Sequence, residues 1–235
     1  MSVRSPQLVA LAEAALDLVV PQECAGCAQP GRVWCRQCAS ACATPPTQVA
    51  EGIRLWAACE HAGPAGRGVV AFKDAGVRRM AGPLATLLAG AVGTALGDAG
   101  TSGGVPVWLV PIPTRRSAVR ARGSDHMSVL AGRAARVLRR AGVAANRCPG
   151  LVHVRASSDQ VGLTRNQRIA NVQGSLRALE LPPGVVVIVD DVTTTGATVR
   201  EAIRAMTRAG RPVACAAAVT WSPGARRRAS GTHWD

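Results

Sequence analysis

The stretch that decides the fold is residues 185–198, which read Val-Val-Val-Ile-Val-Asp-Asp-Val-Thr-Thr-Thr-Gly-Ala-Thr. The first five residues are aliphatic, which is typical of a strand buried on both faces of a parallel sheet. Two carboxylates, Asp190 and Asp191, follow at the carboxyl end of this predicted strand. A loop rich in threonine and glycine leads into a helical pattern at residues 198–209. This order predicts an α/β fold with a ligand crevice outside the carboxyl end of the strand.

The loop after the two carboxylates is suited to hold a phosphate group. Its candidate ligands are hydroxyl-bearing or small residues: Thr193, Thr194, Thr195, Gly196, Ala197 and Thr198. Unpaired N–H groups at a helix start favour anions, and adjacent carboxylates suit ribose hydroxyls and Mg²⁺. A 5-phosphorylated ribose would satisfy both parts of such a site. An apolar strand that ends in acidic residues also occurs in phosphate-loop enzymes and response-regulator receivers, but the threonine-rich loop favours the sugar phosphate.

The cysteines are concentrated near the amino terminus. Cys24 and Cys27 form one C-x-x-C pair, and Cys35 and Cys38 form a second pair after an interval of seven residues. Four thiolates at this spacing predict a structural zinc site with no open coordination position. A redox motif or two disulfides would use the same residues. No strand is predicted before the pairs and the expected compartment is reducing, so zinc is the favoured interpretation.

Strand-like and helix-like segments alternate along the rest of the chain, which is typical of a parallel sheet flanked by helices. We expect strands near residues 53–59, 105–112, 151–154, 185–189 and 213–219, and helices near 8–20, 77–97, 127–141 and 198–209. The glycines and the proline of residues 63–68 predict a break in regular structure. The chain then divides into an amino-terminal helix with the cysteine module (1–47), an α/β domain (48–222) and a basic, disordered tail (223–235).

Charge is distributed unevenly in this chain, which has 28 basic and 14 acidic residues and a formal net charge of +14. Residues 113–168 carry twelve arginines and two acidic residues. Such a segment would attract a polyanion: a pyrophosphate-bearing sugar, nucleic acid or both. No secretory signal is recognisable, and the longest uncharged run, residues 81–97, is short for a membrane span. We therefore expect a cytoplasmic protein without a membrane span.

Taken together, these motifs resemble the competence-protein-F (ComF) family, in which a zinc ribbon is fused to a type I phosphoribosyltransferase domain. The resemblance covers residues 10–220 in order. Residues 185–198 resemble the 5-phosphoribosyl-1-pyrophosphate (PRPP) motif of that domain. Further matches are the double C-x-x-C, Val70-Ala71-Phe72-Lys73, Pro111-Ile112-Pro113, and the set Arg155, Gln160, Leu163, Arg168 and Asn171. The implied fold is a type I phosphoribosyltransferase-like parallel sheet flanked by helices, with a small N-terminal zinc-ribbon module.

The resemblance also implies a reaction, in which a nitrogen nucleophile displaces pyrophosphate from C1 of PRPP. It assigns Asp190 and Asp191 to the ribose hydroxyls, directly or through Mg²⁺, and residues 193–198 to the 5-phosphate. The candidates for the pyrophosphate are basic residues: Arg115 and Arg116 first, then Arg168 and Lys73. The acceptor would be nucleobase-like and is not identified, and the role would lie in nucleobase salvage or in DNA uptake. A rival interpretation is a non-catalytic module that binds single-stranded DNA or a helicase-like competence partner.

One segment departs from the family pattern. The family usually has Arg-Gly-Phe-Asn-Gln where residues 122–126 read Arg-Gly-Ser-Asp-His. If this segment contacts the acceptor or the pyrophosphate, the departure implies a different substrate or a lower activity. His126 invites a catalytic role, but a histidine beside an aspartate at a helix start is more often a neighbour of the cap. We therefore leave His126 out of the predicted site.

Overall fold

The computed structural model describes residues 23–50, 52–101, 104–154 and 172–223, and its centre is a six-stranded sheet. The strand order is β1-β2-β8-β7-β3-β4. Five of these strands run parallel: β2 (Leu55–Glu60), β8 (Val213–Trp221), β7 (Val185–Thr193), β3 (Val107–Pro111) and β4 (Ala145–Arg147). The short β1 (Thr47–Gln48) is antiparallel to β2 at one edge. The predicted parallel sheet is confirmed, with β7 in its interior.

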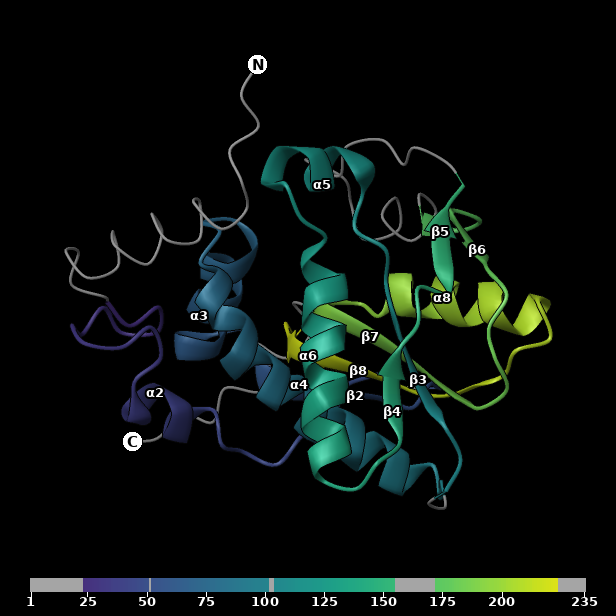
Figure 1. The fold of residues 1–235 in the computed structure, drawn as a ribbon, viewed down its shortest axis with the longest axis horizontal. Helices are drawn as coiled ribbons and strands as arrows, with labels where there is room; N and C mark the ends of the chain where they lie inside the picture. The colour runs from purple at the N-terminus through teal and green to yellow at the C-terminus, as the bar shows by residue number, and fades with distance from the viewer. Residues whose placement is uncertain (1–22, 51, 102–103, 155–171, 224–235) are drawn as a thin grey trace, which may run out of the picture.

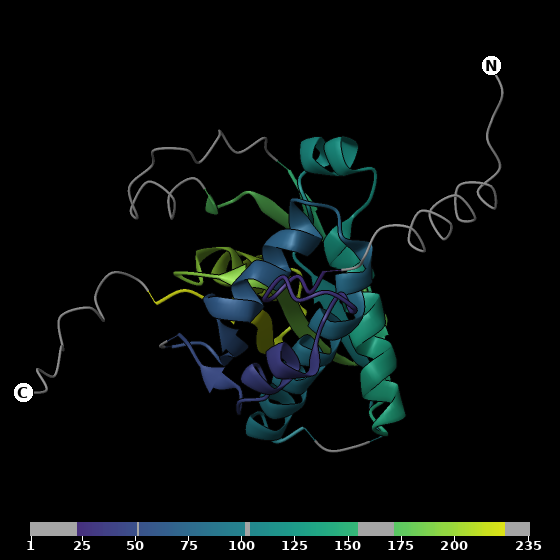
Figure 2. The same cartoon turned by 90° about the vertical axis from the view of Figure 1, so that its left-hand side faces the viewer.

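Helices cover both faces of the sheet (Figures 1 and 2). The helices α3 (Gly63–Lys73), α4 (Ala81–Asp98) and α6 (His126–Arg140) lie on one face, and α8 (Ala197–Arg208) lies on the other. Val187 and Val189 of β7 belong to the core under α4 and α6, whereas Val186 and Ile188 belong to the core under α8. Successive side chains of a strand point to opposite faces, so the aliphatic run of β7 supplies both cores.

The most apolar helix of the described part is a core helix. Residues Arg78–Asp98 form a 21-residue helical segment that is long and apolar enough to cross a membrane. In this fold α4 instead packs against β2, β8 and α6. Its buried side chains are mostly alanine and leucine, and Leu84, Leu88 and Val92 are almost completely inaccessible. Small side chains on this helix allow a close approach to the sheet.

Sequence reasoning missed the first helix of the domain, because α3 begins inside the predicted break at residues 63–68. Pro64 stands in its first turn, where proline is tolerated. The glycines within it permit close packing: a Cβ on Gly66 would lie 3.2 Å from the backbone of His61. A Cβ on Gly68 would lie 2.9 Å from the Met80 side chain. These glycines therefore serve tertiary packing, which overrides their low helix propensity.

Two smaller parts flank the sheet. The strands β5 (Leu151–His153) and β6 (Leu176–Ala178) form an antiparallel pair beyond the carboxyl ends of the parallel strands, and β6 contacts α8. The cysteine module, with α2 (Arg36–Ala41), packs against α3, where Arg67 donates a hydrogen bond to the Gly26 carbonyl. The predicted amino-terminal helix and residues 224–235 of the predicted tail lie outside the described residues. The domain boundaries stay a prediction.

Candidate phosphoribosyl site

A cavity of about 450 Å³ opens at the carboxyl ends of β3 and β7. Parallel sheets place their ligands at this edge. The lining side chains come from α3, the segment after β3, the start of α6, β5, the residues before β6, the end of β7 and the segment from β7 into α8. The polar ones are Lys73, Thr114, Arg115, His126, His153, Ser175, Asp190, Asp191, Thr194 and Thr198. Both predicted carboxylates and part of the predicted phosphate loop therefore share one cavity.

Asp191 is the more enclosed of the two carboxylates and is 4% exposed. Its Oδ1 accepts a hydrogen bond from the Val192 N–H at 2.8 Å. Its Oδ2 lies 3.1 Å from Lys73 Nζ and 3.1 Å from His126 Nε2. Burial opposes ionisation of Asp191, but the His126 hydrogen bond and the Lys73 charge outweigh it and hold its pKa below the usual range. Asp191 is thus a charged carboxylate within a fixed set of partners.

Asp190 has different surroundings although it is the adjacent residue. It is half-buried and lines the cavity, and its Oδ1 accepts the Asp191 N–H at 2.9 Å. Burial and the negative charge of Asp191 raise the pKa of Asp190 well above its ordinary value. A cation or hydroxyl donors bound at Asp190 would favour its ionised form. A ligand that supplies such groups would therefore be stabilised by electrostatic attraction to Asp190.

The predicted phosphate loop divides among three environments. Thr194 and Thr198 line the cavity. Thr193 is the last residue of β7 and is 4% exposed, and Thr195 lines a neighbouring hollow of about 290 Å³ together with Ala197. Gly196 stands at the start of α8 with φ near 70°, in the left-handed region that glycine adopts without strain. Two of the six predicted loop residues thus reach the cavity with their side chains, while Gly196 shapes the backbone turn.

The basic residues predicted to hold pyrophosphate are only partly brought together. Lys73, at the last turn of α3, and Arg115 both line the cavity. Arg115 directly precedes the short helix α5 (Arg116–Arg122). Arg116 belongs to that helix, but its side chain is outside the part that the structure describes, as is the whole of Arg168. Lys73 was predicted as a weaker candidate, and its contact with Asp191 places it at the centre of the site.

His126 is the site residue that sequence reasoning missed. Asp125 caps α6 by accepting the Ser128 N–H, as expected for an aspartate at a helix start. His126 then points inward: it is 7% exposed, contacts Asp191, and packs edge-on against Phe72 with ring centroids 6.1 Å apart. A carboxylate only accepts hydrogen bonds, so Nε2 carries the proton in this contact. The sequence around His126 gave no signal of this role. The contact joins His126 to Asp191, which is 65 positions away in the chain.

The β5–β6 pair closes another side of the cavity. His153, on β5, lies with Nε2 2.8 Å from the Pro113 carbonyl oxygen, which ties the pair to the segment after β3. Val172 and Ser175, which precede β6, also line the cavity. Its neighbours 155–171 lie outside the described residues, so the family matches at Arg155, Gln160, Leu163, Arg168 and Asn171 are not described.

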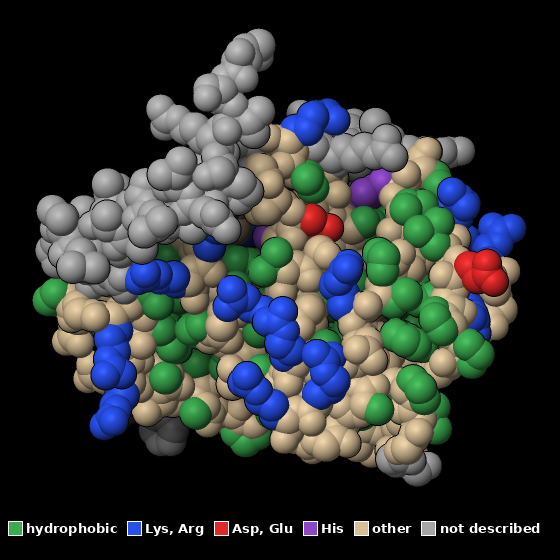
Figure 3. Space-filling model, viewed as in Figure 1, with side chains coloured by type: hydrophobic (Ala, Val, Ile, Leu, Met, Phe, Trp, Pro, Cys, Tyr) green, Lys and Arg blue, Asp and Glu red, His purple; other side chains and the backbone are tan. Residues whose placement is uncertain are grey.

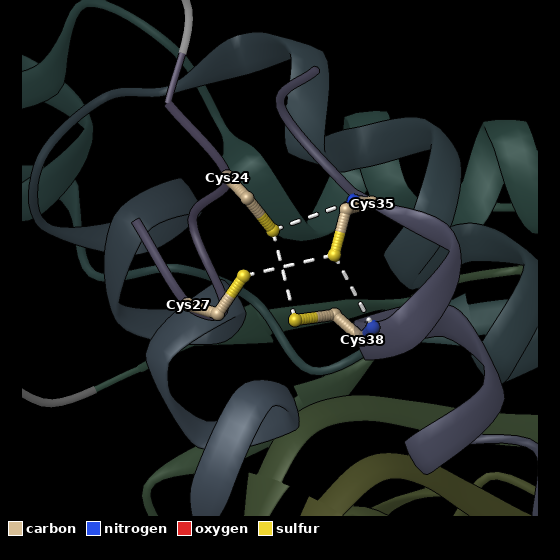
Figure 4. A group of neighbouring side chains, drawn as sticks. All are labelled: Cys24, Cys27, Cys35 and Cys38. Atoms are coloured by element: carbon tan, nitrogen blue, oxygen red, sulfur yellow. Dashed lines mark hydrogen bonds between the residues drawn. The ribbon is translucent and has the colours of Figure 1, made fainter. Parts of the chain in front are cut away.

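The four amino-terminal cysteines form a separate cluster (Figure 4). Their sulfur atoms all lie within 4.8 Å of one another, and the pairs Cys24–Cys38 and Cys27–Cys35 are each 3.6 Å apart. Sulfurs bound to one tetrahedral zinc at about 2.3 Å lie roughly 3.8 Å apart, so the donor set fits that ion. Burial opposes ionisation of Cys24, but N–H groups of Cys35 and Gly26 lower its pKa to about 6. The remaining thiols of the described residues, Cys42, Cys59, Cys148 and Cys215, are buried or half-buried.

One comparison with known proteins bears on the cavity. Residues 128–235 match the family model of the phosphoribosyl transferase domain. No curated protein matches the chain. The matched range begins within α6 and includes β7, the threonine-rich loop, α8 and β8, which carry Asp190, Asp191 and the predicted phosphate loop. The carboxyl-terminal part of this chain, residues 128–235, is therefore similar to a phosphoribosyl transferase domain.

Proposed function

We propose that this protein binds PRPP with Mg²⁺ and transfers its 5-phosphoribosyl group to a nitrogen nucleophile. The observation that carries the proposal is the cavity in which Asp190 and Asp191 lie beside Thr194 and Thr198 at the start of α8. A phosphorylated ribose needs carboxylates that accept hydrogen bonds from its hydroxyls and a helix start whose N–H groups bind its phosphate. The match of residues 128–235 to the phosphoribosyl transferase domain supports the same ligand.

The proposed reaction breaks the bond from C1 to the pyrophosphate oxygen and forms a bond from C1 to the acceptor nitrogen. The transition state has oxocarbenium character, so the protein acts by position and electrostatics. Asp190 and Asp191 would place negative charge beside the ribose, and Thr194, Thr198 and the N–H groups after Gly196 would hold the 5-phosphate. Mg²⁺, when bound with PRPP, would neutralise charge on the leaving pyrophosphate. Basic side chains would assist its departure: Lys73 and Arg115, which line the cavity, with Arg116 and Arg168 as further candidates.

A calorimetric titration tests the binding step. The unmutated protein should bind PRPP in the presence of Mg²⁺, and Thr194→Val with Thr198→Val should weaken binding about tenfold, since two hydroxyls facing a charged phosphate are lost. Thr86→Val is the matched control, because Thr86 is an exposed residue of α4 whose hydroxyl bonds only the Gly82 carbonyl within its own helix. Absence of PRPP binding at millimolar ligand with Mg²⁺ would reject the proposal.

The acceptor is the least constrained part of this function. We propose a nucleobase-like compound, as the resemblance to the ComF family implies, with a role in nucleobase salvage or competence. Release of pyrophosphate from PRPP, measured across a panel of nucleobases, identifies the acceptor class. Binding of PRPP without pyrophosphate release for any of the bases would favour the non-catalytic alternative.

We propose a structural zinc ion at Cys24, Cys27, Cys35 and Cys38. A closed set of four thiolates contributes folding energy and leaves no position for a substrate. Cys24→Ser should therefore destabilise the amino-terminal module, and elemental analysis should find about one zinc ion per unmutated chain. Protein purified without chelators that contains no zinc would contradict this proposal.

A second candidate function, binding of single-stranded nucleic acid, is favoured by the charge on one face of the molecule. Figure 3 shows lysine and arginine side chains gathered on the face formed by α6 and β4. Arg133, Arg136 and Arg140 are exposed at helical spacing on α6, and Arg147 of β4 is exposed beside them. The sequence has no acidic residue from 126 to 158. No negatively charged side chain of this stretch would therefore repel a polyanion.

The test for nucleic-acid binding is its salt dependence. Replacing Arg133, Arg136 and Arg140 with glutamine should flatten the slope of log affinity for single-stranded DNA against log salt by about two, at roughly 0.7 per lost charge. Replacing Arg177 of β6, Arg208 of α8 and Arg211, which follows α8, changes net charge equally and is the control. Equal slopes for the two triple variants would reject a binding surface on α6. A helicase-like partner remains part of this alternative.

A further inference from the structure

The two adjacent carboxylates of the cavity have unlike hydrogen-bond partners. Within the described part of the chain, the two oxygens of Asp191 make three contacts, with Val192, Lys73 and His126. Asp190 has one, from the N–H of Asp191 to its Oδ1. An oxygen that already accepts two charged or N–H donors has little capacity left for a ligand hydroxyl. The two carboxylates are equivalent in the sequence motif, but they differ in the hydrogen-bond partners that surround them in the fold.

We propose that Asp190 is the carboxylate that binds the ribose hydroxyls, and that Asp191 is a positioning residue that holds Lys73 for the pyrophosphate with the help of His126. This inference rests on the proposed function and assigns separate tasks within that site. Asp190 lines the cavity and keeps an oxygen without a partner among the described residues. Asp191 is the point where three elements meet, since Lys73 comes from α3, His126 from α6 and Asp191 from β7.

Lys73 needs such an anchor. Its side chain is 34% exposed and has four rotatable bonds, so an unanchored ammonium group would sample many positions. The 3.1 Å contact with Asp191 fixes it at the cavity wall, where it can still present N–H donors to a phosphate oxygen. Pyrophosphate then meets a cation that is already in place, which lowers the entropy cost of binding.

His126 supports the same arrangement from a more buried position. Its side chain is 8% exposed, and its Nε2 shares Asp191 Oδ2 with Lys73. Its Nδ1 lies 3.4 Å from the hydroxyl of Thr114, which itself donates to the Asp125 cap of α6 at 2.8 Å. The orientation of Asp191 is therefore linked to the start of α6. We class His126 as a positioning residue, because it acts on the ligand through Asp191.

Two partial ligands separate the tasks: ribose 5-phosphate, which lacks the pyrophosphate, and inorganic pyrophosphate with Mg²⁺, which lacks the sugar. Asp190→Asn should weaken ribose 5-phosphate binding at least tenfold and leave pyrophosphate binding within threefold. Asp191→Asn should leave ribose 5-phosphate within threefold. Lys73→Met should weaken pyrophosphate about tenfold and leave ribose 5-phosphate within threefold. Both aspartate substitutions preserve side-chain shape, so they are matched controls for each other.

A double-mutant cycle tests whether Asp191 acts through Lys73. If it does, the tenfold effect of Lys73→Met on pyrophosphate binding should fall below threefold in the Asp191→Asn background. His126→Leu should reduce the Lys73→Met effect in the same way, whereas His126→Gln, which keeps an N–H donor toward Asp191, should restore it. A residue needed only for folding would not show this rescue. Thermal melts of each variant confirm that the compared proteins are folded.

Each result of this experiment decides the inference. The inference is supported if Asp190→Asn and Asp191→Asn differ for ribose 5-phosphate and the cycle shows coupling. It is overturned if both substitutions weaken ribose 5-phosphate equally, or if Lys73→Met has the same effect in both backgrounds. Failure of the unmutated protein to bind PRPP, ribose 5-phosphate or pyrophosphate rejects the proposed function itself and this inference with it. The two failures therefore give different measurements.

Discussion

A methyl group added at Gly26 should weaken metal binding by the cysteine cluster. A Cβ built at this position would lie 2.6 Å from the Cys38 sulfur and 3.0 Å from the Trp34 ring. Ordinary van der Waals contact begins near 3.4 Å, so Gly26→Ala requires a displacement of about 0.8 Å in this part of the cluster. Metal–ligand distances tolerate about 0.2 Å. The sulfur therefore cannot absorb the clash and stay within bonding distance.

The magnitude follows from overpacking, which costs about 1–3 kcal/mol in a closely packed site. Because 1.4 kcal/mol is a factor of ten, zinc affinity should fall about 5- to 150-fold. Competition with a chromophoric chelator measures this affinity, and thermal melts with and without chelator report the linked loss of stability. Zinc affinity of Gly26→Ala within threefold of the parent would refute the argument from the geometry of the cluster.

The reverse substitution two residues later is the matched control. Ala28 has φ near 62°, and it is the only non-glycine residue with a positive φ among the described residues. The left-handed conformation costs a residue with a Cβ about 1 kcal/mol or more. Ala28→Gly should therefore stabilise the zinc-bound module by roughly 0.5–1 kcal/mol, although it also removes one methyl group from the same turn. Opposite signs for Gly26→Ala and Ala28→Gly would separate a steric effect from a general sensitivity of the cysteine module to substitution.

Three further predictions concern stability, each measured by thermal or urea unfolding. Gly184→Ala should destabilise the fold by at least 1–3 kcal/mol, because its Cβ would lie 2.5 Å from a backbone carbonyl oxygen and its φ is 149°; wild-type stability would contradict the packing at that turn. Gly90→Ala should stabilise by about 0.5–1 kcal/mol, since Gly90 is exposed within α4 and its Cβ meets nothing within 4 Å; a loss of stability would contradict it. Glu201 is 3% exposed and accepts hydrogen bonds from Arg204 and the Leu176 N–H. Burial opposes its ionisation, but these bonds and the Arg204 charge lower its pKa below 4.5. Its ionised form therefore stabilises the fold fully above that pH, and this contribution disappears as the pH falls through the lowered pKa. Glu201→Gln should cost about 1–3 kcal/mol at pH 7 and progressively less in acid, and a difference independent of pH would contradict this.

The parts of the fold that could be predicted are those with strong local patterns. The aliphatic run of β7 and the apolar spacing of α6 each specify one element without reference to the rest of the chain. The two-residue β1 and three-residue β4 have too few residues for a pattern, and they form because neighbouring strands offer free edges. The helix α3 was missed because its glycines are required by close contacts, with the His61 backbone at Gly66 and with the Met80 side chain at Gly68. Such contacts are invisible in a single sequence.

The same distinction applies to the candidate site. The motif that contains Asp190, Asp191 and Thr194 is contiguous, so a phosphoribosyl site could be predicted there from residue types alone. The different surroundings of the two carboxylates could not, because they depend on Lys73 of α3 and on His126 of α6. Sequence spacing gives no measure of which of two adjacent carboxylates meets a cation. The arrangement of three elements around Asp191 is therefore information that only the folded chain holds.

The departure at residues 122–126 takes on a different meaning in this arrangement. Asp125 accepts the Ser128 N–H at the start of α6, which the oxygen of an asparagine at that position would also do. His126 gives an N–H to Asp191, which the amide of a glutamine would also supply. An asparagine and a glutamine at these two positions could therefore make the same two hydrogen bonds. Ser124 is the position where an aromatic ring is lost, and it is not among the residues that line the cavity. The departure therefore gives no reason to expect weaker binding of the phosphoribosyl group.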